Sequence, residues 1–265
     1  MGDLDTATNV TYAVPGMGQT AATMDSWTKA SQNLQSLLPP GSAVVAWIGY
    51  ETSPPAVENV DPSVFNVDDA VAGGAALAVS VHGLSAVRGD SIPKPNAIGH
   101  SYGTTTIAVA ASRSDVEFGT FVALGSAGLP DSADSVNDLH VESMYAGQAR
   151  SKFPFEEESG DEAAWIGREY SDDHHVNPVD PGFGARAFGV ETGGDAGRVV
   201  TNHDALESDD GDLVGYFDVG SEALLNAANA LSGKTDLLTE YKPLGLTEFQ
   251  NNSIRRLTGV NVDSW

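Results

Sequence analysis

The 265-residue chain contains no cysteine, and this absence excludes disulfide bonds, a thiolate nucleophile and thiolate metal ligands. Basic residues are also scarce, because 13 lysines and arginines stand against 37 aspartates and glutamates. The resulting formal net charge of -24 repels phosphate backbones and anionic lipid surfaces. We therefore expect no nucleic-acid partner.

Three further absences bear on targeting and on domain organisation. Residues 1–5 show neither a basic nor an apolar segment, so no signal peptide is visible. No unbroken run of about 18 apolar residues occurs, and we expect no transmembrane segment. Internal repeats and low-complexity linkers are lacking too, which predicts a single domain over residues 1–265.

Strand-like and helix-like stretches alternate along the chain. Short apolar runs bounded by turn residues predict strands at 10–14, 43–48, 119–125, 141–146 and 185–190, with a further run ending at Gly99. Apolar residues at helical spacing predict helices at 24–38, 68–88 and 221–231. This alternation is typical of an α/β fold, with a mostly parallel sheet covered by helices on both faces.

The most informative stretch is residues 95–111. An apolar run ends at Gly99, the residues Gly-His-Ser-Tyr-Gly follow at 99–103, and helical spacing begins at once. The pattern predicts a strand, a tight turn and a helix, with Ser101 at the apex. Glycines two residues either side are needed because β-carbons there would collide with the neighbouring strand and helix. The arrangement resembles the nucleophile elbow of α/β-hydrolases, which makes Ser101 the expected nucleophile.

A glycine-rich turn at residues 15–20 leaves the first predicted strand. Such a turn can direct backbone N–H groups at one point, where an oxyanion or a phosphate binds. No Gly-Lys-Ser/Thr follows, and this disfavours the phosphate. Within this turn we expect Met17 and Gly18 to supply N–H donors, and we expect the N–H groups of Met17 and Tyr102 to form an oxyanion hole; the alternative is a turn with no ligand.

A serine nucleophile needs a histidine as its base, and the histidine needs a carboxylate to orient it. In α/β-hydrolases the order is serine, acid, histidine, with the histidine in a loop after the last strand. Four of the six histidines follow Ser101, and only His203 lies after the last predicted strand and before a helix. His203 is therefore the expected base, whereas His82 lies in a predicted helix and is read as a structural residue.

The acid should follow the strand predicted at 141–146, where Asp161 is the first aspartate. The alternatives are its acidic neighbours Glu156, Glu157, Glu158, Glu162, Asp172 and Asp173. All of them lie in residues 147–184, an irregular stretch that we expect to be a lid-like insertion. Its aromatic residues either line a hydrophobic entrance or anchor the loop: Phe153, Phe155, Trp165 and Tyr170. Proline-rich residues 51–62 predict a second loop near the ligand, and residues 233–265 predict a C-terminal tail with a short helix.

A metal site is the rival interpretation of Asp172-Asp173-His174-His175 and of the acidic run Glu207–Asp212. Adjacent histidines point apart on regular structure, no His-Glu-x-x-His occurs, and the acidic run lacks the spacing of a calcium loop. We therefore expect neither a metal nor a cofactor.

Several stretches together resemble an uncharacterised α/β-hydrolase family best known from actinobacterial genomes. They are residues 14–20, 46–50, 98–103, 125–128, 144–146 and 183–185. The resemblance covers residues 10–231 and implies an α/β-hydrolase fold, Ser101 as nucleophile, and His203 as the histidine of the family's Gly-His-Ser stretch. Asp161 matches the family's aspartate only across a longer insertion. His175 stands where the family has His-Gly, and its role is not carried over.

These observations predict a serine hydrolase that cleaves a carboxylic ester of a small-molecule or lipid-like substrate through an acyl-enzyme. Its catalytic triad would be Ser101, His203 and Asp161, with Met17 and Tyr102 at the oxyanion hole. Two alternatives stay open: an acyltransferase, amidase or peptidase that uses the same triad, and a catalytically idle binding or secretion-associated module.

Overall fold

The computed structural model describes residues 1–50, 65–89, 93–207 and 213–258. The predicted loop at 51–62 and residues 208–212 of the acidic run lie outside the described residues.

Six strands form one sheet in the order β2-β1-β3-β4-β5-β6, and every pairing between them is parallel. The strands are β1 (Asn9–Val14), β2 (Ser42–Ala46), β3 (Asn96–His100), β4 (Phe118–Leu124), β5 (Val141–Gly147) and β6 (Arg186–Ala187). The α/β fold is confirmed. β6 is shorter than the predicted 185–190, because Phe188 and Gly189 turn to pair with Glu240 and Thr239 of the C-terminal segment.

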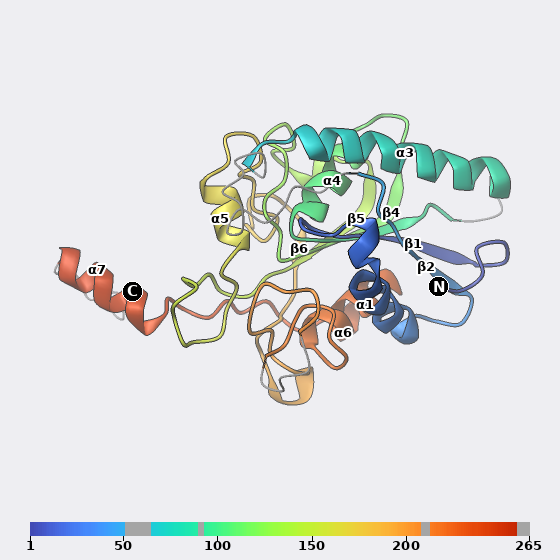
Figure 1. The fold of residues 1–265 in the computed structure, drawn as a ribbon. Coiled ribbons are helices and arrows are strands. Elements are labelled where there is room, and N and C mark those ends of the chain that lie inside the picture. Colours follow the sequence, from blue (N-terminus) through green and yellow to red (C-terminus); the bar gives the residue numbers. More distant parts are fainter. Residues whose placement is uncertain (51–64, 90–92, 208–212, 259–265) are drawn as a thin grey trace.

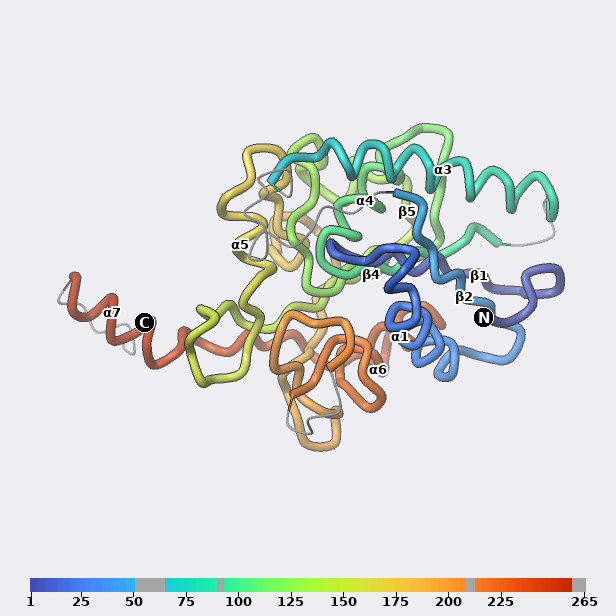
Figure 2. Tube along the Cα trace, in the orientation of Figure 1, coloured from blue at the N-terminus to red at the C-terminus, as the bar shows by residue number. Residues whose placement is uncertain are grey.

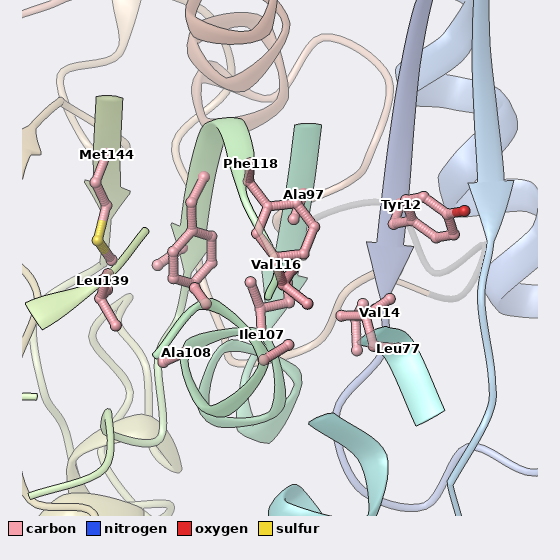
Figure 3. Packing of buried hydrophobic residues seen from close by; sticks show 14 of the residues in the cluster. Tyr12, Val14, Leu77, Ala97, Ile107, Ala108, Val116, Phe118, Leu139 and Met144 are labelled. Carbon is pink, nitrogen blue, oxygen red and sulfur yellow. The ribbon is translucent and has the colours of Figure 1, made fainter. Parts of the chain in front are cut away.

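Helices cover both faces of the sheet (Figure 1). α3 (Asp68–Arg88) and α4 (Tyr102–Ala111) pack on one face, and α1 (Met24–Leu37) and α6 (Glu222–Leu231) pack on the other. Each interface is a separate apolar cluster. Figure 3 shows the first, where Ile107 of α4 and Leu77 of α3 lie beneath side chains of β1, β3 and β4. Burial of such side chains is the main stabilising contribution to the fold.

α3 bears on the expectation that the chain has no transmembrane segment. By length and composition alone this helix is apolar enough to cross a membrane, with a mean hydropathy of 1.6. Its sequence contains no unbroken apolar run because glycine, serine and histidine interrupt the apolar residues. This is weak evidence of a span, since core helices meet the same criterion; a third of the apolar window is buried within the fold.

The long segment after β5 carries a short helix, α5 (Ala164–Glu169), and the predicted C-terminal tail contains the helix α7 (Glu248–Thr258). In Figures 1 and 2, α7 lies apart from the sheet and its covering helices. Aromatic rings join the two segments, because Phe153 lies 5.3 Å from Trp165 and 6.1 Å from Phe249, measured between ring centroids. These contacts support the anchoring interpretation of Phe153 and Trp165.

The strand order positions the loops at the carboxyl edge of the sheet. The chain moves outward from β1 to β2 and then returns past β1 to β3, so the loops after β1 and β3 leave neighbouring strands. Such a switch point is where open α/β sheets bind ligands. Val14 pairs with Gly99, which brings residues 15–17 beside Ser101.

Gly103→Ala is expected to destabilise the fold, because the new Cβ would lie 2.5 Å from the carbonyl oxygen of Pro15 and closer still to that of Val14. Forcing an atom against a backbone that cannot yield costs about 1–3 kcal/mol or more. Urea denaturation measures the loss.

Gly83→Ala is the matched control. Gly83 lies in α3, and a methyl group added there would have no neighbouring atom within 4 Å, so alanine should stabilise the helix by about 0.5–1 kcal/mol. Equal stability of Gly103→Ala and the unmodified chain would contradict the packing described for the turn.

Candidate active site

Ser101 occupies a strained backbone conformation between β3 and α4. Its φ is 53° and its ψ is -130°, and among the described residues it is the one non-glycine residue with a positive φ. A Cβ at Gly99 would lie 2.8 Å from the backbone nitrogen of Thr104 in α4, and one at Gly103 would strike the end of β1. The two glycines thus let strand and helix approach closely enough to present the serine at the apex.

Hydrogen bonds hold this turn in place. The backbone N–H of Ser101 donates to the carbonyl oxygen of Leu124 at 3.0 Å, which ties the turn to the end of β4. The backbone N–H and the hydroxyl of Thr104 both donate to the carbonyl oxygen of Ser101, at 3.0 Å and 2.7 Å. Hydrogen bonds on both sides therefore stabilise the strained backbone of Ser101. They use only its backbone groups, so its Oγ is left available for another partner.

His203 is that partner. Its Nε2 lies 2.8 Å from the Oγ of Ser101, although 102 residues separate the two in sequence. The loop that carries His203 is fixed by backbone bonds of Thr201, which donates to Val214 and accepts from Gly160 at 3.1 Å. The histidine side chain is 16% exposed. A small part of the His203 side chain is therefore accessible to solvent.

Asp161 lies on the other side of the imidazole. Its two carboxylate oxygens lie 2.9 Å and 3.0 Å from Nδ1 of His203. Because an ionised carboxylate only accepts hydrogen bonds, Nδ1 carries the proton and Nε2 of the neutral ring accepts from the Ser101 hydroxyl. The structure thus brings the expected serine, histidine and aspartate into one hydrogen-bonded chain.

The backbone around Asp161 explains how a residue of the long insertion reaches this position. After β5 the chain loops out and returns, so that the backbone of Asp161 donates to the carbonyl oxygen of Arg150 at 2.8 Å and accepts from Lys152 at 3.1 Å. Asp161 therefore lies beside the continuation of β5. The residues between Lys152 and Asp161 form a loop that leaves β5 and returns to it, so the Asp161 carboxylate stays near the end of β5.

The charges of the pair are set by burial and by mutual attraction. Burial alone would raise the pKa of Asp161, but His203 and hydrogen bonds from Ala164 and Tyr216 hold that pKa below its usual range. Burial alone would lower the pKa of His203, but Asp161, with smaller contributions from Glu162 and Asp204, raises it above 6.5. Near neutral pH the aspartate is ionised.

The alternative acids lie elsewhere or have other partners. Glu156, Glu157 and Glu158 line a groove beside Phe249 of α7, and Glu158 accepts a hydrogen bond from the backbone of Glu248. The charge of Glu162 raises the pKa of His203. Asp172 and Asp173 are exposed.

The glycine-rich turn after β1 passes against the serine. A Cβ at Gly16 would lie 2.7 Å from Cβ of Ser101 and 3.2 Å from its Oγ. Met17 packs against a small apolar cluster that contains Tyr102, the first residue of α4. The first backbone N–H groups of a helix have no partner within it, so this end of α4 is a suitable place for a developing negative charge.

Three other histidines, His174, His175 and His82, have partners of their own. Nδ1 of buried His174 lies 3.1 Å from the carbonyl oxygen of Ala127, whereas Nδ1 of His175 lies 2.7 Å from Asp131. In the part of the chain that the structure describes, no group of three or more histidine, aspartate and glutamate side chains could hold a metal ion. His82 contacts the carbonyl oxygen of Asp115 at 2.7 Å on the surface.

Two residues at the site were not anticipated from the sequence. His100 directly precedes the serine, and its Nε2 lies 2.8 Å from the carbonyl oxygen of His203, so Nε2 is the donor. Burial, together with the nearby His203, lowers the pKa of His100 to about 3. The other is Tyr216, whose hydroxyl donates to Asp161 at 2.8 Å. The aromatic pair at 216–217, in a polar loop just before a predicted helix, was the available signal for burial.

The chain is similar to known proteins over most of its length. The profile of a protein family described as alpha/beta hydrolase matches residues 1–152. An uncharacterized protein of Mycobacterium tuberculosis, recorded in two strains, is 29% identical over 242 residues, covering 84% of this chain and 32% of the relative. The chain thus spans about a third of the length of the curated relatives it matches.

Similar solved structures share little sequence with the chain. One is an uncharacterized protein from Bacillus cereus, with 13% identity and a TM-score of 0.48 over 88% of this chain and 62% of that chain. Another is an esterase from Rhizomucor miehei, with 13% identity and a TM-score of 0.47 over 87% of this chain and 77% of that chain.

The pKa values of the two neighbouring histidines, His203 and His100, should depart from the usual value in opposite directions. NMR of the imidazole nitrogens between pH 8 and pH 5 should show His203 gaining its second proton above pH 6.5, because Asp161 stabilises the charged ring. His100 should remain neutral throughout, because burial opposes its charge. Joint titration of both rings near pH 6.5 would contradict the described electrostatics.

Proposed function

Because the chain belongs to the alpha/beta hydrolase family, we propose that it is a serine hydrolase that cleaves carboxylic esters through an acyl-enzyme. The observation that carries the proposal is the hydrogen-bonded chain from Ser101 through His203 to Asp161. A serine hydroxyl is a poor nucleophile unless a base accepts its proton, and the neutral Nε2 of His203 lies within reach to do so.

In the first half of the reaction, Oγ of Ser101 attacks the acyl carbon while its proton moves to Nε2 of His203. Asp161 stabilises the imidazolium that forms and keeps its ring oriented. The carbonyl oxygen becomes an oxyanion, which the backbone N–H groups of Met17 and Tyr102 would hold. The C–O bond to the alcohol then breaks, and His203 returns the proton to the leaving oxygen.

In the second half, water replaces the alcohol. His203 takes a proton from the water as it attacks the acyl carbon, and the collapse of the second tetrahedral intermediate returns that proton to Ser101. An ester suits this chemistry better than an amide because an alkoxide leaves more readily than an amine anion. The substrate class is thus a small-molecule or lipid-like ester, and no step uses a cofactor.

A fluorophosphonate probe should label Ser101, because an activated serine attacks phosphorus as it attacks an acyl carbon. Gel fluorescence and peptide mass spectrometry measure the extent and the position of labelling. Ser101→Ala should abolish the signal, whereas Ser36→Ala, which removes an exposed hydroxyl on α1, should leave it unchanged. An unreactive, folded wild-type chain would favour the idle module.

The pH profile of ester hydrolysis should show an acid limb above pH 6.5. His203 acts as a base only when neutral, and Asp161 raises its pKa, so activity is lost as pH falls through that raised value. Rates on a nitrophenyl ester give the profile. Asp161→Asn should lower kcat on the order of 10⁴-fold and move the limb to lower pH. A profile unaffected by this substitution would exclude Asp161 from the role proposed.

A further inference from the structure

We infer that Tyr216 is a positioning residue that sets the orientation of Asp161 and, through it, the basicity of His203. This inference rests on the proposed function, since it concerns the same serine, histidine and aspartate. Tyr216 does not touch the serine. It acts on the reaction through the carboxylate that its hydroxyl contacts.

The hydroxyl of Tyr216 has one orientation consistent with its partners. The backbone N–H of Ala149 donates to the phenol oxygen at 3.0 Å, and this bond occupies a lone pair. The O–H is then directed at the Oδ2 of Asp161, 2.8 Å away. Because Tyr216 is fully buried, no water competes for either bond.

The other oxygen of Asp161, Oδ1, accepts from the backbone N–H groups of Ala163 and Ala164 at 3.0 Å and 2.8 Å. Among the described residues, Tyr216 and His203 are the side chains that donate to Oδ2, so Tyr216 fixes this side of the carboxylate. Without it the orientation of the carboxylate would depend on the two backbone N–H groups and on His203 alone.

Tyr216 also joins the three segments that assemble the site. Its backbone N–H donates to the carbonyl oxygen of Asp204, the residue after His203, at 2.9 Å. Its hydroxyl reaches Ala149 just beyond β5 and Asp161 in the insertion. One residue thus links the loop of the base to the loop of the acid.

Other groups pack closely around the hydrogen bond between Tyr216 and Asp161. A Cβ at Gly125 would lie 2.9 Å from Cε2 of Tyr216 and 3.2 Å from Oδ2 of Asp161. The ring of His100 packs against the phenol as well, 5.5 Å away between centroids. Glycine at position 125 thus lets the end of β4 approach the phenol and the carboxylate closely, and the ring of His100 packs beside the phenol.

The hydrogen bond has a defined electrostatic effect. A donor on Oδ2 draws part of the negative charge of Asp161 towards itself, so the carboxylate stabilises the imidazolium of His203 less than a free carboxylate would. The other titratable or charged groups that act on His203 or Asp161 remain unchanged when this hydroxyl is removed; they are His100, Glu162, Arg168, Glu191 and Asp204.

Tyr216→Phe tests the inference because it removes the hydroxyl and keeps the ring. We expect kcat for a nitrophenyl ester to fall about tenfold with little change in KM, as for other groups that orient a functional residue. The acid limb should move upward by about half a pH unit, because Asp161 regains charge. Unchanged kcat together with an unchanged limb would overturn the inference.

Tyr12→Phe is the matched control. It also removes the hydroxyl of a buried tyrosine, one that donates to the carbonyl oxygen of Ser80 at 3.0 Å, and Tyr12 belongs to the apolar cluster on the opposite face of the sheet from Tyr216. This variant should keep the wild-type kcat and pH limb. An equal loss of kcat in both variants, with the limb unmoved in both, would assign Tyr216 a general structural role and contradict the inference.

A second probe covers the case in which Tyr216→Phe fails to fold. Site-specific 3-fluorotyrosine at position 216 keeps the hydroxyl and makes it a stronger donor, so the acid limb should move to lower pH. The Nδ1 proton of His203, observed directly by ¹H NMR, should also shift from its position in the unmodified chain. An acid limb and an Nδ1 resonance that both stay unchanged in the fluorinated protein would overturn the inference.

These readouts separate the two proposals. If fluorophosphonate fails to label the wild-type chain, the proposed function fails, yet the Nδ1 resonance still reports whether Tyr216 acts on the Asp161–His203 pair. If the wild-type chain is labelled and Tyr216→Phe is labelled at the same rate across pH, the function stands and the role of Tyr216 is rejected.

Discussion

The backbone of Ser101 is the constraint on which the rest of the site depends. A residue with a side chain is held at a φ of 53°, a region that only close packing on both sides can maintain. Gly99 and Gly103 permit that packing, and the parallel order of the strands places the turn at the carboxyl edge. Because β1 lies beside β3, the same geometry brings the glycine-rich turn against the serine.

A buried carboxylate is the second requirement, and its charge is costly unless its hydrogen-bond partners are complete. Asp161 has no exposed surface, and it is compensated by His203, by two backbone N–H groups and by the hydroxyl of Tyr216. The neutral His100 beside it adds no competing positive charge. The overall excess of acidic residues contributes little here, because the decisive groups lie within a few ångströms of one another.

Much of this arrangement could be predicted from the sequence. Apolar periodicity identified the strands and most helices, and glycine spacing identified the Ser101 turn, because both reflect local backbone geometry. The pairing of His203 with Asp161 was harder, since only chain order pointed to them. Tyr216 and His100 could not be assigned roles, because their contacts depend on tertiary packing across loops. The high mean hydropathy of α3 was not noted because glycine, serine and histidine interrupt its apolar residues.

If the proposed reaction takes place, Ser101 becomes covalently acylated during turnover. Rapid mixing of the protein with a nitrophenyl ester, followed by acid quenching and peptide mass spectrometry, measures this acylation. We predict an initial burst of about one nitrophenol per chain and an acyl group on the peptide that contains Ser101. Ester turnover that persists in Ser101→Ala, or an acyl group found on another residue, would contradict this prediction.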